Sequence, residues 1–480
     1  MLNREQMVSE IAREVVARLQ LRLDGKSAPP VAPTATGDGV FATADEAVKA
    51  AAEAQPKVAA MSLQDRGRMI AVIRRICDEQ AGELGRMELE ETKIGRLDHK
   101  IAKLHAMKFV VGVEQMERIQ ARADASGLCV VERAPWGVIG MVLPATHSVP
   151  TMVSNAINIL AAGNAAVFSP HPAAARVAAY ALKLFNREIE RTSGVSNVIT
   201  MVAKPTLESV AQIFHHPDVA LICVTGGPAV VKAAMQSGKR VIAGGPGNPP
   251  VVVDETADLD KAARDIIAGA AFDNNLLCIG EKEVFVVASV ADRFKRAMLA
   301  AGAVELDSQA IDRLTKAAFT FEDEGKGCAR AHVNKDFVGR DPSVLAQAAG
   351  ARIPDSTQLL FGETAENHPF VQEEQMMPFL PLVRVPDVDA AIAASLRAEH
   401  GYRHTAVMHS RNLDNVTKMA RAMNTTIFVN NAPSTGSLGV DGPGYFSHTI
   451  ATPTGEGVTT PLTFTRERQI AIGGGALRIV

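Results

Sequence analysis

The stretch that decides the fold is Val138–Pro170, VIGMVLPATHSVPTMVSNAINILAAGNAAVFSP. Its first six residues indicate a short buried strand, and Ser148–Leu160 has the composition of a helix. The glycine and asparagine in Ala161–Asn164 end that helix, and Ala165–Pro170 is a second short strand. A strand, a helix and a strand in this order predict a parallel sheet with a helical crossover, so we expect an α/β protein.

The same alternation extends in both directions along the chain. Downstream, the pattern predicts two more helices and two more strands, which are Ala173–Arg191, Asn197–Met201, Thr206–His215 and Val219–Val224. Upstream, residues 43–120 are charged and alanine-rich with helical periodicity, which predicts a layer of helices. Toward the C-terminus, residues 239–254 indicate a strand, a Gly/Pro loop and a strand, and Asn424–Asn431 indicates another strand.

Composition excludes one broad class of partner and bounds the number of lobes. A chain of 480 residues is too long for one hydrophobic core, so we expect two sizeable lobes, and 47% hydrophobic residues are enough to fill them. The net charge of −3 and the 4% of aromatic residues argue against a basic, base-stacking surface. We therefore expect no nucleic acid among the partners.

Cys278 is the candidate nucleophile. It lies in Ala271–Gly280, AFDNNLLCIG, between a predicted helix, Leu259–Ala271, and a predicted buried strand, Glu283–Ala288. A connecting turn of this kind can present a thiol to a cleft. Taken alone, a lone cysteine is more often a small buried side chain, and the catalytic interpretation depends on the stretches described below.

The remaining cysteines and the histidines do not indicate a metal site. The five cysteines are Cys77, Cys129, Cys223, Cys278 and Cys328. They form no CxxC pair and none stands beside a histidine pair, so we expect a reducing compartment and neither a disulfide framework nor zinc. His400 and His404 have helical i, i+4 spacing, but Gly401 lies between them and no glutamate occupies the metalloprotease position. We expect no metal ion.

The loop Thr225-Gly226-Gly227-Pro228 is a second candidate site. It follows a predicted strand and opens a predicted helix, Ala229–Ser237. Small residues and free backbone N–H groups at a helix start can bind an anion such as a phosphate. Because the motif is not GxGxxG, the same glycines are also compatible with a simple tight turn.

The N-terminus differs from the rest of the chain. Residues 2–22 place Leu2, Met7, Ile11, Val15 and Leu19 on one face of an amphipathic helix. The helix has neither an uninterrupted apolar run nor a cleavage site, so we expect no signal peptide and no membrane span. Residues 24–39 form a Pro/Gly/Ala/Thr linker. The helix therefore serves an external partner, or it packs on its own body or between subunits.

Five stretches in order carry a family resemblance: Leu160–Pro172, Val224–Pro228, Gly247–Asp260, Asn275–Lys282 and Thr449–Gly457. They resemble the aldehyde dehydrogenase superfamily, and in detail its CoA-acylating branch associated with bacterial microcompartments. The resemblance covers residues 40–480. It implies a Rossmann-type nucleotide-binding lobe at 41–240, an α/β catalytic lobe at 241–430 and a return of 431–480 to the first lobe. A β oligomerisation arm, built from segments near 122–136 and 462–480, implies a homodimer or homotetramer.

The resemblance also implies roles for individual residues. Cys278 matches the family nucleophile, and Glu374 matches the carboxylate that reaches the nicotinamide ribose. The cofactor loops match at Ser169, Pro170 and His171 on the adenosine side and at Thr225, Gly226, Gly227 and Pro228 around the phosphates. These matches imply NAD as cofactor and coenzyme A as a substrate. A thiolate at Cys278 would add to the aldehyde, lose hydride to NAD and retain the acyl group as a thioester.

Two departures from the hydrolytic members of the superfamily are informative. Where those members carry a glutamate that activates water, alignment places Gly244, so an acyl thioester should survive until the CoA thiol collects it. Where relatives have an oxyanion-binding asparagine, this chain has His147. A histidine N–H can donate to the oxyanion, with a pH dependence near neutrality, or the ring turns away and backbone N–H groups suffice.

The sequence therefore predicts NAD-dependent oxidation of a short aliphatic aldehyde, propionaldehyde before acetaldehyde, to acyl-CoA. The rival functions are a hydrolytic aldehyde dehydrogenase, a cysteine acyltransferase that does not use nicotinamide, and a non-catalytic scaffold. The N-terminal residues 1–22, followed by the linker 23–40, resemble the encapsulation peptides of this branch, which bind shell or cargo proteins. The expected location is the cytoplasm, inside a bacterial microcompartment.

Overall fold

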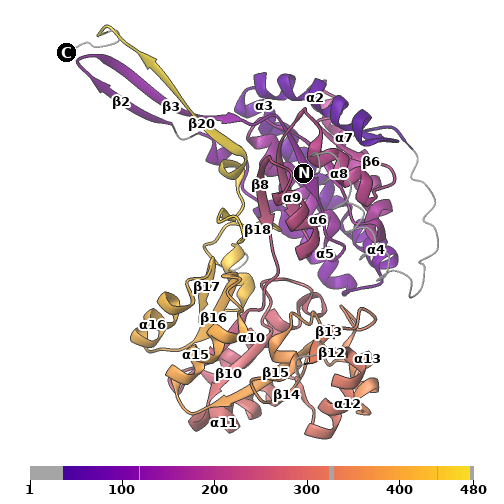
Figure 1. The fold of residues 1–480 in the computed structure, drawn as a ribbon, viewed down its shortest axis with the longest axis vertical. Helices are drawn as coiled ribbons and strands as arrows, with labels where there is room; N and C mark the ends of the chain where they lie inside the picture. The colour runs from indigo at the N-terminus through magenta and orange to yellow at the C-terminus, as the bar shows by residue number, and fades with distance from the viewer. Residues whose placement is uncertain (1–35, 118, 324–328, 440–441, 476–480) are drawn as a thin grey trace, which may run out of the picture.

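The computed structural model describes residues 36–117, 119–323, 329–439 and 442–475 (Figure 1). The predicted N-terminal helix, residues 2–22, lies outside the described residues, as does most of the linker that follows it. The described chain forms two lobes, each built on a parallel sheet, and a projecting arm (Figure 1). This is the predicted α/β class.

The first lobe contains a six-stranded sheet in the order β1-β6-β5-β4-β7-β8, and every neighbouring pair is parallel. The strands are β1 (Val40–Phe41), β4 (Val138–Val142), β5 (Ala165–Ser169), β6 (Ile199–Val202), β7 (Val219–Thr225) and β8 (Arg240–Gly244). The helices are α2 (Ala44–Ala60), α3 (Leu63–Glu79), α4 (Ala81–Thr92), α5 (Leu97–His105), α6 (Ser148–Ala161), α7 (Ala175–Ser193), α8 (Leu207–His215) and α9 (Pro228–Met235). The predicted helical layer and β-α-β order are confirmed, and the boundaries of the individually predicted elements of this lobe differ from those observed by at most two residues.

Alternating strand residues explain why helices cover both faces of this sheet. In β4 and β5, Ile139 and Phe168 belong to the hydrophobic cluster that includes α3, α6 and α7, whereas Val138 and Val167 belong to the cluster that includes α2, α8 and α9. All four side chains are at most 3% exposed. A strand buried on both faces needs an apolar residue at nearly every position, as in the stretch that decided the fold.

The second lobe contains a seven-stranded sheet in the order β11-β14-β15-β10-β9-β16-β17, again with parallel neighbours. The strands are β9 (Pro250–Val253), β10 (Glu283–Val287), β11 (Val304–Glu305), β14 (Leu360–Glu363), β15 (Phe379–Val385), β16 (Thr405–His409) and β17 (Ile427–Asn430). The helices are α10 (Leu259–Ala270), α11 (Ala288–Ala300), α12 (Ser308–Ala318), α13 (Pro342–Ala349), α14 (Pro369–Gln372), α15 (Val388–Ala398) and α16 (Leu413–Met423). A hairpin of β12 (Phe319–Asp323) and β13 (Ala329–Val333) is inserted after α12.

The arm is a three-stranded antiparallel sheet that projects away from both lobes (Figure 1). It consists of β2 (Gln120–Asp124), β3 (Gly127–Pro135) and β20 (Thr465–Ile472), and β3 is the central strand. These strands come from the two segments that the resemblance assigned to the arm. Most of their residues are exposed or half-exposed in the single chain, including Ile470 at 40%. A short pair, β18 (Ile450–Ala451) and β19 (Gly457–Val458), packs beside β8.

Candidate active site

The carboxyl edge of the six-stranded sheet brings four predicted segments together. The register pairs Val142 of β4 with Ser169 of β5 and with Val224 of β7, and pairs Thr225 with Gly244 of β8. The loops that follow these strands are therefore neighbours, and they contain His147, His171, the Thr225–Pro228 loop and the residues after Gly244. Ligands of open α/β sheets bind at this edge.

The two loops predicted to hold the cofactor have features that suit an anionic ligand. No side chain caps the start of α9 at Gly227, so its first backbone N–H groups are not covered by a cap. The buried Ser169 hydroxyl has no hydrogen-bond partner. His171 accepts a hydrogen bond from the Ala173 N–H at 3.2 Å, and burial together with the charge of Lys335 lowers the pKa of its ring.

The turn that carries Cys278 has an unusual backbone. Asp273, Asn274 and Asn275 all have left-handed conformations, with φ values of 49°, 55° and 65°. Aspartate and asparagine tolerate this region better than other residues with side chains, which explains the run Asp-Asn-Asn in a sequence that otherwise indicates a helix end. The Asn275 amide donates to the carbonyls of Ala270 and Glu281, both at 2.9 Å, and so ties α10 to the start of β10.

Cys278 is partly exposed, and its sulfur lies at the end of this turn. The backbone N–H groups of Cys278 and Ile279 point at the sulfur and favour the thiolate. Burial is nevertheless the largest effect and, with the nearby Glu374 carboxylate, raises the pKa of the thiol to about 12, while the Lys282 ammonium acts in the opposite direction. The same burial raises the pKa of Glu374 to about 7.

The amino edge of the second sheet gathers the residues around the thiol. The segments before β9, β10, β15 and β16 contain Gly247, Cys278, Glu374 and His404, and these four strands are neighbours. A Cβ atom on Gly247 would lie 2.7 Å from the Cys278 carbonyl oxygen and 2.9 Å from Cγ of His404, so only glycine fits between them. The Gly247 N–H donates to the Glu374 carboxylate.

His404 is a residue of this site that the sequence did not identify. It is 1% exposed, its Nδ1 lies 2.9 Å from the Thr405 hydroxyl, and its Nε2 has no partner. Burial and the charge of Lys282 lower the pKa of its ring to about 4, so the ring is neutral at pH 7 and its free nitrogen can accept a proton. In the sequence, His404 was notable only for its i, i+4 spacing from His400, and the residues around that pair argued against a metal site. Nothing local in the sequence indicated that His404 lies beside Gly247.

His147 is the N-cap residue of α6 and is 5% exposed. Its Nδ1 has no partner, its Nε2 lies 3.4 Å from the Thr146 hydroxyl, and its ring packs 5.3 Å from the ring of His448. Burial, followed by the charges of Lys103, His448 and Lys100, lowers the pKa of His147 well below 6.5. Any pH dependence that it contributes is therefore displaced from neutrality to acid pH.

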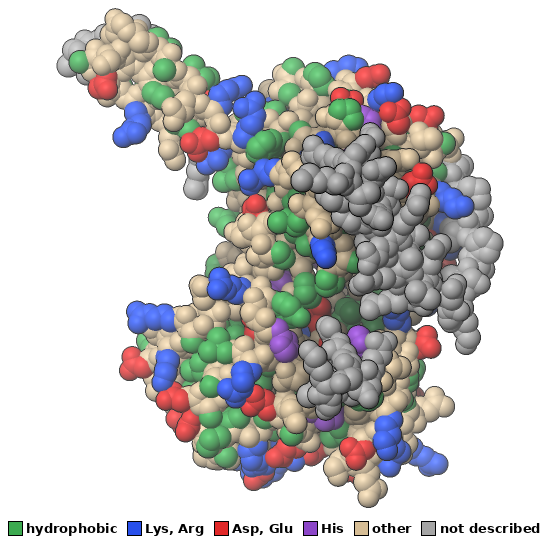
Figure 2. Space-filling view, in the orientation of Figure 1, with side chains coloured by type: hydrophobic (Ala, Val, Ile, Leu, Met, Phe, Trp, Pro, Cys, Tyr) green, Lys and Arg blue, Asp and Glu red, His purple; other side chains and the backbone are tan. Residues whose placement is uncertain are grey.

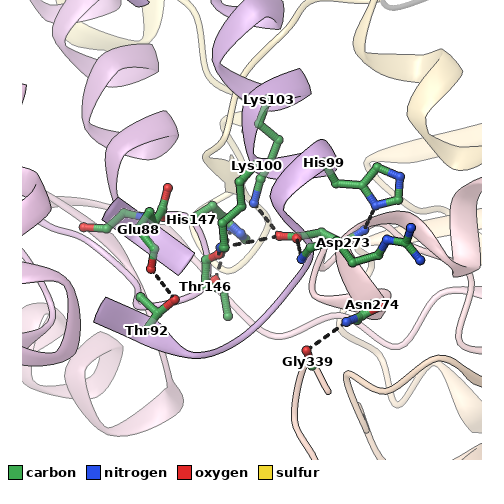
Figure 3. A network of polar contacts seen from close by, with 12 residues as sticks. Glu88, Thr92, His99, Lys100, Lys103, Thr146, His147, Asp273, Asn274 and Gly339 are labelled. Carbon is green, nitrogen blue, oxygen red and sulfur yellow. Dashed lines mark hydrogen bonds and ion pairs between the residues drawn. The ribbon is translucent and has the colours of Figure 1, made fainter. Parts of the chain in front are cut away.

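A buried polar network lies behind His147 and joins the lobes (Figure 3). The Asp273 carboxylate is 2.5 Å from Nζ of Lys103 and 3.9 Å from Nζ of Lys100, and it also accepts the Arg96 N–H at 2.8 Å. The carboxyl of Glu88 accepts the Ser148 N–H at 2.8 Å, and burial raises its pKa. Asp273 precedes Cys278 by five residues, so its hydrogen bonds with Lys103 and with the Arg96 N–H attach the turn that carries Cys278 to α5 of the first lobe.

Comparison with known proteins identifies the family. The model named Aldehyde dehydrogenase family matches residues 7–311 of the chain. The chain belongs to the aldehyde dehydrogenase family. The acetylating acetaldehyde dehydrogenase EutE of Salmonella typhimurium is 45% identical to this chain. The match covers 97% of this chain and 98% of EutE. The predicted family and fold are confirmed.

Two solved structures extend the comparison. A propionaldehyde dehydrogenase from the fucose utilisation bacterial microcompartment of Clostridium phytofermentans is 40% identical, with a TM-score of 0.88, and the match covers 92% of this family member and 100% of that chain. The propionaldehyde dehydrogenase of Rhodopseudomonas palustris, solved with bound CoA and an acylated cysteine, is 41% identical with a TM-score of 0.88. That match covers 93% of this family member and 100% of the other chain.

Two further findings are limited to the described residues. Within them, no group of three or more His, Cys, Asp or Glu side chains is placed to hold a metal ion. No helix in the same part of this family member is long and apolar enough to cross a membrane. Figure 2 shows histidine and apolar side chains between the two lobes.

Proposed function

We propose that the protein oxidises a short aliphatic aldehyde to acyl-CoA with NAD, through a thioester on Cys278. The observation that carries this proposal is the partly exposed Cys278, whose sulfur faces the backbone N–H groups of Cys278 and Ile279 in a turn attached to both lobes. The relatives support the same chemistry, since one is named an acetylating acetaldehyde dehydrogenase and another was solved with CoA and an acylated cysteine. Propionaldehyde is the favoured substrate and acetaldehyde is the next.

The residues of the chain divide the reaction into two halves. In the first, the Cys278 thiol loses its proton to solvent and adds as the thiolate to the aldehyde carbon. The resulting alkoxide is stabilised by backbone N–H groups and by His147, whose unpartnered Nδ1 donates as an N–H. When bound, NAD supplies the nicotinamide that accepts the hydride. Loss of the hydride re-forms the C=O bond and leaves an acyl thioester on sulfur. Because the oxygen is already an alkoxide, this step needs no base to remove a proton from it.

In the second half, the CoA thiol attacks the thioester and Cys278 is the leaving group. The attacking thiol must lose a proton, and the neutral His404, with its free Nε2, is the acceptor that we propose. Hydrolysis is slow because residue 244 is glycine, with the Ile450 carbonyl and Thr225 as its neighbours, and neither is a base for water. The two halves define a ping-pong sequence.

The cofactor is proposed to lie on the edge of the six-stranded sheet. We assign its adenosine side to Ser169, Pro170 and His171, its phosphates to Thr225, Gly226, Gly227 and Pro228, and its nicotinamide ribose to Glu374. The uncapped start of α9 and the buried, unpartnered Ser169 hydroxyl suit these assignments because both have unused capacity for hydrogen bonds.

A steady-state assay tests the function. NADH formation is followed at 340 nm with aldehydes of two to four carbons, with and without CoA, and the products are separated as acyl-CoA or free acid. We expect sustained turnover only with CoA, and without it a burst limited to one NADH per Cys278. Release of free acid at the same rate without CoA would refute the proposal in favour of a hydrolytic enzyme. Absence of NADH would favour the acyltransferase.

The arm and the N-terminus suggest assembly. The exposed antiparallel sheet β2-β3-β20 is proposed as the oligomerisation arm of a homodimer or homotetramer, which light scattering of the purified protein measures. Residues 1–22 are proposed to bind microcompartment shell or cargo proteins through their apolar face, which would place the enzyme inside a microcompartment in the cytoplasm. Deleting residues 1–22 should preserve turnover and abolish co-assembly with a shell; retained co-assembly would exclude this role.

A further inference from the structure

Lys282 is a fully buried lysine directly behind the turn of the nucleophile. Its Nζ donates to the Asn275 carbonyl at 2.7 Å, to the Asn275 side-chain oxygen at 2.6 Å and to the Leu277 carbonyl at 3.2 Å. All three acceptors belong to the four residues that end at Cys278. The ammonium therefore fixes the turn that presents the sulfur, although the sequence marked Lys282 only as part of a family motif.

The charge of Lys282 is not neutralised by a direct ion pair. Among the residues that the structure describes, no carboxylate lies within salt-bridge distance of its Nζ, and its hydrogen bonds all go to neutral oxygens. The adjacent Glu281 is held by the N–H and hydroxyl of Ser434, at 2.8 and 2.9 Å. Both oxygens of the buried Glu283 lack partners, and burial raises the pKa of its carboxyl well above the usual value, which disfavours a negative charge there.

A buried ammonium without a counter-ion is unfavourable unless a nearby group benefits from its field. Cys278 is the group that can do so, because its thiolate would be a negative charge at the end of the turn that Lys282 holds. Glu374 has the opposite effect on the same sulfur. Its carboxylate accepts the N–H of Gly247, on which a Cβ would lie 2.7 Å from the Cys278 carbonyl oxygen, and its negative charge disfavours a second negative charge on sulfur.

We propose that Lys282 is a positioning residue for the nucleophile, which holds the Asn275–Cys278 turn and stabilises the Cys278 thiolate against the opposing charge of Glu374. This inference rests on the proposed function only in taking Cys278 as the nucleophile. The site then has a further requirement, because the reactivity of the Cys278 thiol depends on two opposing charges. Lys282 lies in the segment before β10, and Glu374 lies in the segment before β15. No cofactor is needed for this balance to act.

The test is the pH dependence of Cys278 alkylation by iodoacetamide, with the modified residue located by mass spectrometry. The variants are Lys282→Met, Lys282→Arg and Glu374→Gln, and Cys278→Ala defines the background. Lys100→Met is the matched control, because it also removes a fully buried ammonium but from the network behind His147. Circular dichroism and thermal melting show whether each variant is folded.

We expect Lys282→Met to slow alkylation at a fixed pH by about tenfold for each unit by which the thiol pKa rises. Glu374→Gln should shift the profile in the opposite direction, and Lys282→Arg should restore much of the wild-type rate because it keeps the charge. Lys100→Met should leave the profile unchanged. General loosening of the fold would expose the thiol in every variant and would move all profiles in one direction.

Unchanged profiles for folded Lys282→Met and Glu374→Gln would overturn the inference, as would shifts of both in the same direction. If Lys282→Met does not fold, the Glu374→Gln variant tests the inference, because Glu374 is partly exposed and its replacement is better tolerated. A wild-type alkylation profile for Glu374→Gln would then refute the proposed balance of charges. The proposed function fails separately: full activity after complete alkylation of Cys278 would refute it, whatever the pH profiles show.

Discussion

Replacing Asp273 by asparagine is the most direct test of how the two lobes hold the turn that carries Cys278. Asp273 is fully buried, and its carboxylate contacts Lys103 at 2.5 Å with Lys100 at 3.9 Å. Asparagine keeps the shape, the tolerance of a left-handed backbone and an oxygen that can accept the Arg96 N–H. The substitution therefore removes the negative charge and replaces the Oδ2 acceptor of the Lys103 ammonium by an amide N–H donor.

The expected loss of stability follows from the charges that remain. Asp273→Asn leaves the buried ammonium groups of Lys103 and Lys100 without their shared carboxylate, and breaking a buried pair in this way costs about 3–5 kcal/mol. Removing both partners, in Asp273→Asn with Lys103→Met, leaves a smaller excess charge. The double variant should therefore be less destabilised than the sum of the single variants, by about 1–3 kcal/mol.

Unfolding in urea at pH 7 measures these differences. Circular dichroism follows both lobes, and the fluorescence of the single tryptophan, Trp136, follows the first lobe; protein concentration is kept constant because assembly would add to the apparent stability. The exposed pair of Asp45 and Lys49 provides the control, and Asp45→Asn should leave the unfolding curve nearly unchanged. A loss below about 1 kcal/mol for Asp273→Asn, or strict additivity in the double variant, would refute the reasoning.

The pH dependence of the same experiment has a defined sign. The charges of the two lysines outweigh burial and lower the pKa of Asp273 in the folded protein below its ordinary value of 3.8. Its contribution is therefore present above that ordinary value and is lost as the pH falls through the folded pKa. The difference between wild type and Asp273→Asn should be largest at neutral pH and should shrink below about pH 4.

Three further substitutions test the site. His147→Asn should keep activity but lose an acid limb of the pH–rate profile well below pH 6.5, because an amide does not titrate; identical profiles for both proteins would remove His147 from the oxyanion site. Gly247→Ala should lower kcat by on the order of 10²-fold, since its Cβ would displace the Cys278 carbonyl, and a wild-type kcat would contradict this packing. Gly244→Glu should raise CoA-independent release of free acid by about tenfold or more, as measured by product analysis; no increase would show that the missing base is not what limits hydrolysis.

The sequence was sufficient for the elements and for the family, and it supplied Cys278 as the candidate nucleophile. Periodicity is a local property, so apolar strands such as Val138–Val142 and the helices between them were predicted with boundaries close to those observed. Short motifs around Cys278 and in the Thr225–Pro228 loop carried the family resemblance. The glycine at position 244 indicated acyl transfer to a thiol without any coordinates.

Only the tertiary structure decided which charges surround the sulfur. Gly247, Lys282 and His404 are distant in sequence and become neighbours because the strand order β15-β10-β9-β16 places the segments before those strands at one edge. In the same way, Lys103 meets Asp273 only where the lobes join. Local patterns record whether a residue is in a strand or a helix, but sheet order and contacts between lobes arise from long-range packing. Burial then sets the pKa values, so the chemistry of these side chains could not be read from the chain alone.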